Sequence, residues 1–245
     1  MEVARRLTPG ARVTVMTGAG VSAASGVPTF RGAGGLWRTF RAEDLATPLA
    51  FARDPRLVWE WYDWRRQVIA GCQPNAAHEV LARWTQRPGV ILITQNVDGL
   101  HERAGSREVI RFHGSIWELR CRDDCAGSPA RWQDDTVPFQ TLPPPCPYCG
   151  GILRPNVVWF GEGIDPGVLD RCLGATACDV FLTVGTSAIV HPAASLVHEA
   201  KRQGAFTVEV NLEATPSSGT LDLALQGPAE EILPAIDQEM RGLRM

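Results

Sequence analysis

Four cysteines form two close pairs, Cys121 with Cys125 and Cys146 with Cys149. The second pair lies in the segment 146–151, CPYCGG, a tight turn that directs two thiolates at one point. The first pair can supply two more sulfur ligands, and four thiolates make the closed tetrahedral site typical of structural zinc. Chance pairing and a disulfide are the alternatives, but the turn and the odd total of seven cysteines favour zinc. Such a site stabilises a lobe and leaves no coordination position for catalysis.

A glycine-rich segment, residues 18–23 with the sequence GAGVSA, follows the apolar run VTVM and resembles a dinucleotide-binding turn. Glycines let the backbone approach a pyrophosphate, and the next helix directs its amino end at the charge. Gly26 and Pro28 end that helix early, and no acidic ribose ligand follows about twenty residues on. A loop with Phe30 and Arg31 stands there instead. The pattern predicts a nucleotide cofactor that is used for something other than hydride transfer.

Two further segments carry groups that could act on such a cofactor. Gln95, Asn96 and Asp98 follow an apolar run and could hydrogen-bond a ribose or a carboxamide, although a polar turn is the plain alternative. His113, in the sequence RFHGS, is a candidate general base because an unshifted imidazole titrates near neutral pH. A structural histidine is the alternative for His113, and spacing alone does not decide between the two.

The elements that must position these groups form an alternating pattern. Continuous apolar runs at 13–16, 89–93, 180–184 and 206–210 each end in glycine or polar residues, as buried parallel strands do. Helical segments are predicted around 76–85 and 192–202. In such sheets the ligand lies beyond the carboxyl ends of the strands. We therefore predict an α/β fold with a doubly wound, Rossmann-like parallel sheet.

Two stretches interrupt this alternation. Residues 35–75 are rich in tryptophan with helical periodicity, and residues 116–156 hold the cysteines and a proline cluster. We expect one catalytic domain over 1–245, with a small lobe formed by these helical and zinc-binding insertions. The large lobe then comprises about 1–34, 76–115 and 157–245.

Composition restricts the class of protein. The net charge of −3 argues against a general nucleic-acid binder, and no apolar run is long enough to span a membrane. The first residues, MEVARR, lack the apolar stretch of a signal peptide, and metal-type cysteine spacing is typical of a reducing compartment. We expect a cytoplasmic monomer that binds neither membrane nor nucleic acid stably.

The chain resembles the sirtuins, NAD-dependent protein lysine deacylases. The matching segments occur in the family's order from about Arg12 to Leu233: GAGVSAASGVPTFRGAGGLWR, TQNVDGLHERAG, FHGS, CPYCGG, RPNVVWFGE, VGTSAIVHPAA and VEVNLEATPSS. The resemblance implies a Rossmann-like lobe with a small lobe made of a helical and a zinc module, which agrees with the two insertions. It also implies NAD as a consumed co-substrate, one structural zinc, and acylated-lysine proteins or peptides as partners.

The resemblance implies a role for many individual residues. His113 corresponds to the base that deprotonates a ribose hydroxyl, with Asn96 and Asp98 as further catalytic residues. The implied cofactor-binding residues are Gly18, Ala19, Gly20, Ser22, Ala23, Thr29, Phe30, Arg31, Trp37, Gln95, Asn96, Val97, Asp98, Gly185, Thr186, Ser187, Asn211, Leu212, Glu213 and Ala229. The segment that holds the substrate peptide by β-augmentation is Val157, Val158, Trp159, Phe160 and Gly161.

One pair of residues indicates which class of sirtuin the chain resembles. Tyr62 and Arg65 resemble the Tyr-x-x-Arg pair of class III sirtuins, which bind a carboxylate at the distal end of the acyl group. A guanidinium and a phenol can hold that carboxylate by charge-assisted hydrogen bonds, and Ala42 and Ala46 align with small residues that widen the pocket. The alternative is that Tyr62 and Arg65 are only one packed or solvated face of a helix. With the resemblance, we predict removal of succinyl, malonyl or glutaryl groups, and also acetyl.

The implied reaction transfers the acyl group from lysine to ADP-ribose, and yields free lysine, nicotinamide and O-acyl-ADP-ribose. A plain deacetylase and a mono-ADP-ribosyltransferase on the same scaffold are the nearest alternatives. A non-catalytic NAD or acyl-lysine sensor is disfavoured by the presence of His113 and Asn96. A zinc-ribbon nucleic-acid module is disfavoured by the acidic net charge.

Overall fold

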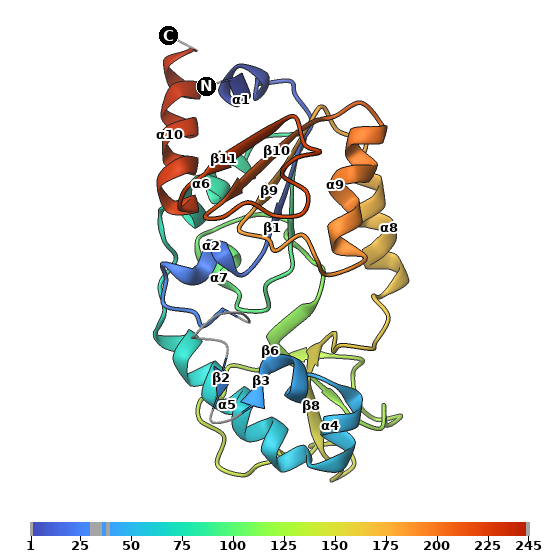
Figure 1. The fold of residues 1–245 in the computed structure, drawn as a ribbon. Coiled ribbons are helices and arrows are strands. Elements are labelled where there is room, and N and C mark those ends of the chain that lie inside the picture. The colour runs from blue at the N-terminus through green and yellow to red at the C-terminus, as the bar shows by residue number, and fades with distance from the viewer. Residues whose placement is uncertain (1, 30–35, 38–39, 244–245) are drawn as a thin grey trace.

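A computed structural model of the chain describes residues 2–29, 36–37 and 40–243. Its main layer is a six-stranded sheet in the order β11-β10-β9-β1-β4-β5, with every neighbouring pair parallel (Figure 1). The strands are β1 (Val13–Thr17), β4 (Val90–Thr94), β5 (Ile110–Arg111), β9 (Val180–Val184), β10 (Phe206–Asn211) and β11 (Leu223–Gln226). Taken in chain order, this is the 3-2-1-4-5-6 arrangement of a doubly wound sheet. The predicted fold class is confirmed.

The two central strands explain why the sheet could be predicted from the sequence. All five residues of β1 and all five of β9 are buried. Val13 and Val15 face one apolar cluster, whereas Met16 faces another on the opposite side of the sheet. A strand covered on both faces needs apolar side chains at successive positions, which produces a continuous run.

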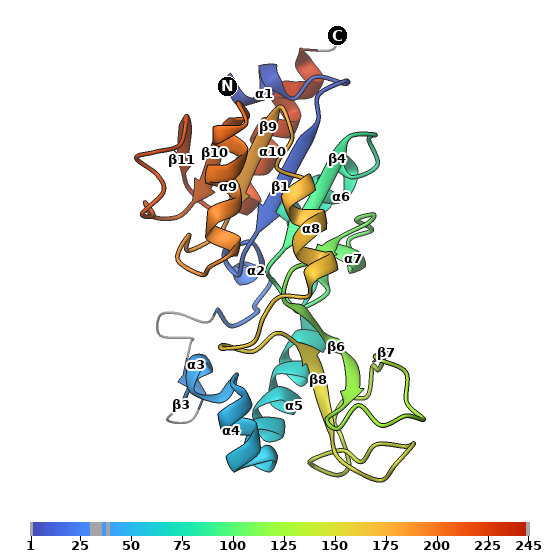
Figure 2. The ribbon, with the colours of Figure 1, turned by 90° about the vertical axis from the view of Figure 1, so that its right-hand side faces the viewer.

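Helices cover both faces of this sheet (Figure 2). The apolar cluster on one face includes residues of α1 (Glu2–Arg6), α6 (Ala76–Trp84) and α10 (Ala229–Gly242). The cluster on the other face includes residues of α8 (Pro166–Gly174) and α9 (Ala193–Arg202). The predicted helices at 76–85 and 192–202 are confirmed to within one residue at each end.

A second group of elements lies beside the carboxyl ends of the strands, at the bottom of Figure 1. It contains α3 (Ala42–Leu45), α4 (Pro48–Arg53), α5 (Pro55–Gly71) and the antiparallel sheet β7-β6-β8. The strands of that sheet are β6 (Gly114–Cys121), β7 (Trp132–Gln133) and β8 (Leu153–Val157), and a separate pair joins β2 (Leu36–Trp37) to β3 (Phe40–Arg41). These elements share an apolar cluster of their own. The lobe boundaries given from the sequence stay a prediction.

The longest helix of this group, α5, begins with clear signals. Asp54 accepts a hydrogen bond from the backbone N–H of Leu57 at 3.0 Å, and Pro55 occupies the first helical position. A capping carboxylate and a proline whose missing N–H is not needed there both favour a helix start. The buried face of α5 carries Trp59, Tyr62 and Arg65. None of the described helices is long and apolar enough to cross a membrane.

Candidate functional site

A cavity of about 740 Å³ lies where the carboxyl ends of the parallel strands meet the second group of elements. Four groups of predicted residues line it: cofactor positions, the base His113, positions of the substrate segment, and positions of the acyl pocket. Those lining the cavity are Gly18, Ala19, Gly20, Thr29, Ala46, Tyr62, Arg65, Gln95, Asn96, Val97, His113, Val157, Val158, Trp159, Phe160, Gly161, Gly185, Thr186, Ser187, Asn211 and Glu213. Residues far apart in the sequence therefore share one concave site, as enzyme sites at a sheet's switch point do.

The glycines after β1 and β9 bring two loops into direct contact. A Cβ built on Gly20 would lie 2.7 Å from the Cα of Gly185, and one on Gly18 would lie 2.8 Å from its carbonyl oxygen. Gly20 also donates its N–H to the Gly185 carbonyl oxygen at 2.9 Å. No side chain fits at either position. The glycines of the GAGVSA segment thus serve the close approach of strand ends at the point where the sheet reverses its order.

Asn96 has a fixed orientation at the end of β4. Its Nδ2 donates to the carbonyl oxygen of Gly18 and to Oγ of Ser22, both at 3.1 Å. Both amide hydrogens are therefore in use, which leaves Oδ1 as the available acceptor. An acceptor lining the cavity suits a hydroxyl group of a bound ribose.

His113 is held in a defined tautomer. Its Nδ1 lies 3.1 Å from the carbonyl oxygen of Gln95, which can only accept, so Nδ1 carries the hydrogen. Burial lowers the pKa of His113, against the opposing effect of the Gln95 carbonyl. The imidazole is neutral near pH 7, and its Nε2 bears the free lone pair. This is the arrangement that a general base requires.

Asp98 and Ser22 lie beneath the cavity rather than among the described residues that line it. Ser22 donates to Oδ2 of Asp98 at 2.8 Å, while Oδ1 accepts the backbone N–H of Leu100 at 2.9 Å. Burial raises the pKa of Asp98 despite these bonds. Because Ser22 also accepts from Asn96, the carboxylate is linked to the cavity through one hydroxyl group.

On the wall formed by α5, Tyr62 and Arg65 lie one helical turn apart and are 3% and 4% exposed. Arg65 lies 5.3 Å over the ring of Trp61 and interacts with the charge of Asp98. Burial lowers the pKa of this guanidinium, and Tyr62 and Asp98 partly offset that effect. Ala46 lines the cavity beside the pair, whereas Ala42 is buried in the adjacent apolar cluster.

Of the remaining predicted positions, three lie away from the cavity and three have no described side chain. Phe30 and Arg31 fall outside the described residues, and Trp37 belongs to β2. Ala23 ends α2 (Gly20–Ala23), Ala229 is buried at the start of α10, and Leu212 is 63% exposed after β10. None of these three is among the described residues lining the cavity.

The cavity also includes residues to which no role was assigned from their sequence. Glu43 and Trp61 come from the helical insertion, and further lining positions are Glu162, Gly163, Ile164, Leu169, Ile189, Val190, His191, Pro192, Ala214, Thr215 and Pro216. Ile189 to Pro192 directly follow the predicted cofactor loop at 185–187, and Glu162 directly follows the predicted substrate segment. Adjacency to those motifs was the signal that could have identified them.

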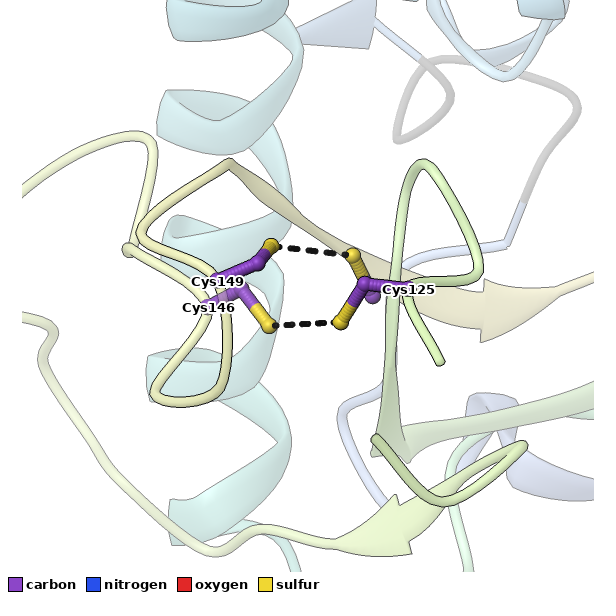
Figure 3. A group of neighbouring side chains, drawn as sticks. Cys125, Cys146 and Cys149 are labelled. Atoms are coloured by element: carbon purple, nitrogen blue, oxygen red, sulfur yellow. Dashed lines mark hydrogen bonds between the residues drawn. The ribbon is translucent and has the colours of Figure 1, made fainter. Parts of the chain in front are cut away.

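The four predicted zinc ligands converge in the second group of elements (Figure 3). Their sulfur atoms all lie within 4.8 Å of one another, with Cys121 to Cys149 at 3.7 Å and Cys125 to Cys146 at 3.9 Å. A disulfide needs about 2.05 Å, whereas sulfurs about 2.3 Å from one zinc lie roughly 3.8 Å apart on a tetrahedron. The cluster fits a single structural zinc ion.

Comparisons with known proteins agree with this geometry. The family model described as the Sir2 family matches residues 18–192. An NAD-dependent protein deacylase of Aquifex aeolicus is 48% identical over 94% of this chain and 95% of its own length. NAD-dependent protein deacylase 1 of Pseudomonas aeruginosa is 47% identical over 92% of both chains.

Solved structures extend the likeness to the whole fold. The crystal structure of a Sir2 homolog–NAD complex is 42% identical, with a TM-score of 0.91 over 100% of this chain and 94% of that chain. A Sir2–p53 peptide–NAD+ complex is 29% identical, with a TM-score of 0.86 over 99% of this chain and 98% of that chain.

Proposed function

Since this chain belongs to the Sir2 family and is an NAD-dependent protein deacylase, we propose that it prefers lysine acyl groups that end in a carboxylate. Its substrates are proteins or peptides with an acylated lysine. The observation that carries the proposed preference is the buried Tyr62–Arg65 pair lining one end of the cavity. Succinyl, malonyl and glutaryl groups have the required chemistry.

At the cofactor end, the loops after β1, β4, β9 and β10 hold NAD. Gly18, Gly20 and Gly185 allow the close approach of the phosphates, although their own N–H groups bond to backbone carbonyls of neighbouring strand ends. Asn211 and Glu213 accept from a ribose. NAD supplies an electrophilic ribose carbon once nicotinamide leaves. The acceptor oxygen of Asn96 orients a ribose hydroxyl within this end of the cavity.

His113 acts as the base. Nδ1 carries the ring hydrogen and donates it to the Gln95 carbonyl, so Nε2 keeps its lone pair. The lowered pKa of His113 keeps the imidazole neutral near pH 7. With NAD and substrate bound, a neutral imidazole could take the proton of a ribose hydroxyl as that oxygen bonds to the acyl carbon, and could return it to the lysine nitrogen as the C–N bond breaks. Asp98 acts through Ser22, whose hydroxyl accepts from Asn96 and so holds that amide in place.

Among the described residues, the lining from the helical insertion and the substrate segment is mainly apolar and aromatic, with the guanidinium of Arg65, the phenol of Tyr62 and the half-buried carboxylate of Glu43. A buried arginine in such a pocket gains far more from a carboxylate than from a methyl group, because charge-assisted hydrogen bonds compensate its desolvation. An acetyl group is too short to offer that partner. The pocket therefore discriminates because an acyl carboxylate adds charge-assisted hydrogen bonds that an acetyl group cannot form.

The test is a substrate series with the wild-type enzyme. One peptide sequence carries acetyl, malonyl, succinyl or glutaryl lysine, and kcat/KM is measured for each together with the products. The proposal expects the three acidic acyl groups to exceed acetyl by at least about tenfold, with O-acyl-ADP-ribose as product. Equal or better use of acetyl would make the enzyme a plain deacetylase. ADP-ribose transferred to protein without acyl loss would favour the transferase alternative.

We further propose that the enzyme is a cytoplasmic monomer without stable nucleic-acid binding. The support is the reduced, metal-type cysteine set and the net charge of −3. Light scattering on the purified protein, with and without added duplex DNA, tests the mass and the binding together.

A further inference from the structure

A hydrogen bond between two side chains joins the substrate segment to the acyl pocket, beside the backbone bond from Phe160 N–H to the Ala46 carbonyl oxygen. The indole Nε1 of Trp159 lies 2.8 Å from the hydroxyl oxygen of Tyr62, and the two side chains are among the buried residues. An indole N–H can donate but never accept. The direction of this bond is therefore fixed by chemistry: Trp159 donates, and the phenol oxygen of Tyr62 accepts.

That direction has a consequence for Tyr62. A phenol has one hydrogen to donate, and the bond from Trp159 occupies acceptor capacity on its oxygen. Burial raises the pKa of Tyr62, so the phenol keeps its hydrogen. The hydrogen is then directed away from Trp159 and remains available as a donor. An acyl carboxylate accepts hydrogen bonds only, so it can bind Tyr62 only when this hydrogen is presented to it.

Trp159 is itself held on both sides. The guanidinium carbon of Arg154 lies 3.5 Å from the centre of the Trp159 ring, and the ring of Phe51 lies at 5.0 Å. Arg154 donates to both carboxylate oxygens of Glu162, at 2.7 and 2.9 Å. Glu162 in turn accepts the backbone N–H of Trp159 at 2.9 Å. This clamp sets the height and tilt of the indole, and thus the position of its N–H.

We propose that Trp159 is a positioning residue for acyl specificity. By donating to the phenol oxygen of Tyr62, it orients the phenol hydrogen toward the distal carboxylate of the acyl group. This inference rests on the proposed preference for acidic acyl groups and adds a residue outside the Tyr62–Arg65 pair. A phenylalanine at position 159 could keep the contacts with Arg154 and Phe51 but has no N–H. The phenol is then free to turn its hydrogen away and to face a carboxylate with a lone pair.

The first test reads the hydrogen bond without any substrate. The chain has two tyrosines, and Tyr148 is 51% exposed, so tyrosine labelled with carbon-13 at Cζ gives two signals. A Tyr148→Phe variant assigns the signal of Tyr62. We expect Trp159→Phe to shift the Tyr62 signal and Trp84→Phe, which removes a different buried indole donor, to leave it unchanged. An unmoved Tyr62 signal in Trp159→Phe overturns the inference.

The second test measures specificity. In Trp159→Phe, kcat/KM for a succinyl peptide relative to the acetyl peptide should fall by roughly fivefold, mostly through KM, as expected for one lost hydrogen bond. The matched variant Trp84→Phe should keep the wild-type ratio. The double variant Tyr62→Phe/Trp159→Phe should equal Tyr62→Phe alone, because Trp159 acts through the phenol.

The outcomes separate the two proposals. If both peptides lose activity alike in Trp159→Phe, or if the two substitutions are additive, Trp159 is a packing residue and the inference is wrong. If the wild-type enzyme shows no preference for succinyl over acetyl, the proposed function fails, whatever the labelled tyrosine reports. If Trp159→Phe folds poorly, the same bond can be tested in Tyr62→Phe. The NMR signal of the Trp159 indole N–H should then shift, because that N–H has lost its acceptor.

Discussion

The two ends of the cavity are built in different ways. At the cofactor end, loops that follow parallel strands supply backbone groups, and side chains such as Asn96 and His113 bond mainly to backbone carbonyls. At the acyl end, Tyr62 of α5 meets Trp159 beyond β8 through a bond between side chains 97 residues apart. Topology alone therefore fixes the first end, whereas the second depends on the packing of separate insertions. Substitutions at the two ends should have different signatures.

Loss of the zinc cluster should have the largest effect of the substitutions considered, and it should affect the acyl end far more than the cofactor end. A structural zinc site contributes roughly 10 kcal/mol or more to the folding of its module. Strand β6 ends at Cys121, and β8, which follows Cys149 and pairs with β6, leads into the substrate segment. Cys146→Ser should therefore abolish turnover of every acyl peptide and greatly lower the melting temperature. NAD binding by the parallel sheet should persist in part.

Metal analysis and calorimetry check this prediction. We expect about one zinc per chain in the wild-type protein. Tyr148→Phe, an exposed position between two of the cysteines, is the matched control and should keep metal and stability. A metal-free wild-type protein with full activity would contradict the assignment.

His113→Ala should lower kcat by at least about 100-fold, the usual loss when a general base is removed. The reduction should be the same for acetyl and succinyl peptides, since His113 belongs to the cofactor end. NAD affinity, measured by calorimetry, should change little. His198→Ala, at a partly exposed histidine bonded to Ser217, serves as the control. Near-native turnover in His113→Ala would show that His113 is a structural histidine and not the base.

Two buried histidines beneath the cofactor end make stability depend on pH. Burial lowers the pKa of His101 to about 4 and, with the charge of His101, that of His78 to about 3. The unfolded chain then binds more protons than the folded one below pH 6.5, so stability is complete above pH 6.5 and falls as the pH drops toward 4. His101 alone accounts for about 3 kcal/mol at full effect.

Urea unfolding between pH 7 and pH 5 measures this dependence before most carboxylates titrate. His101→Gln should flatten the curve. An unchanged slope in His101→Gln would show that this imidazole is charged in the folded protein, contrary to the account.

Gly20→Ala should have a smaller effect, confined to the cofactor end. The new Cβ would meet the Cα of Gly185 at 2.7 Å, and backbone on both sides must shift. Overpacking of this kind costs about 1–3 kcal/mol, and we expect weaker NAD binding with an unchanged ratio of succinyl to acetyl turnover. Gly10→Ala, where nothing lies within 4 Å, is the control for the general cost of an added methyl group. A changed acyl ratio would argue that the two ends are not independent.

How far each element of the fold could be predicted depends on how regular its sequence pattern is. The central strands were readable because burial on both faces demands continuous apolar runs, as in β1 and β9. The edge strand β11 was not assigned, since its four residues only alternate between half-buried and exposed. Strand β5 has two residues, too few for any period. In α10, Pro234 lies inside the helix and interrupts its pattern.

For the site, the strand-end motifs and the cysteine turn carried most of the information. Gly18, Asn96 and Gly185 line one cavity because parallel strands place their carboxyl ends at one edge. The bond between Trp159 and Tyr62 left no local signal, because it depends on how α5 packs against the segment that follows β8. Such contacts follow from tertiary structure alone.

The most direct test of the acyl end is a comparison of Arg65→Met with the wild-type enzyme on succinyl and acetyl peptides. Arg56→Met, on the exposed side of the same helix, controls for the loss of a charge from α5. The account predicts that Arg65→Met lowers kcat/KM for the succinyl peptide by at least about 30-fold, in line with the several kcal/mol at stake when one partner of a buried charge pair is removed. Turnover of the acetyl peptide should fall far less. Equal losses for both peptides in Arg65→Met would contradict the claim that this pair reads the acyl carboxylate.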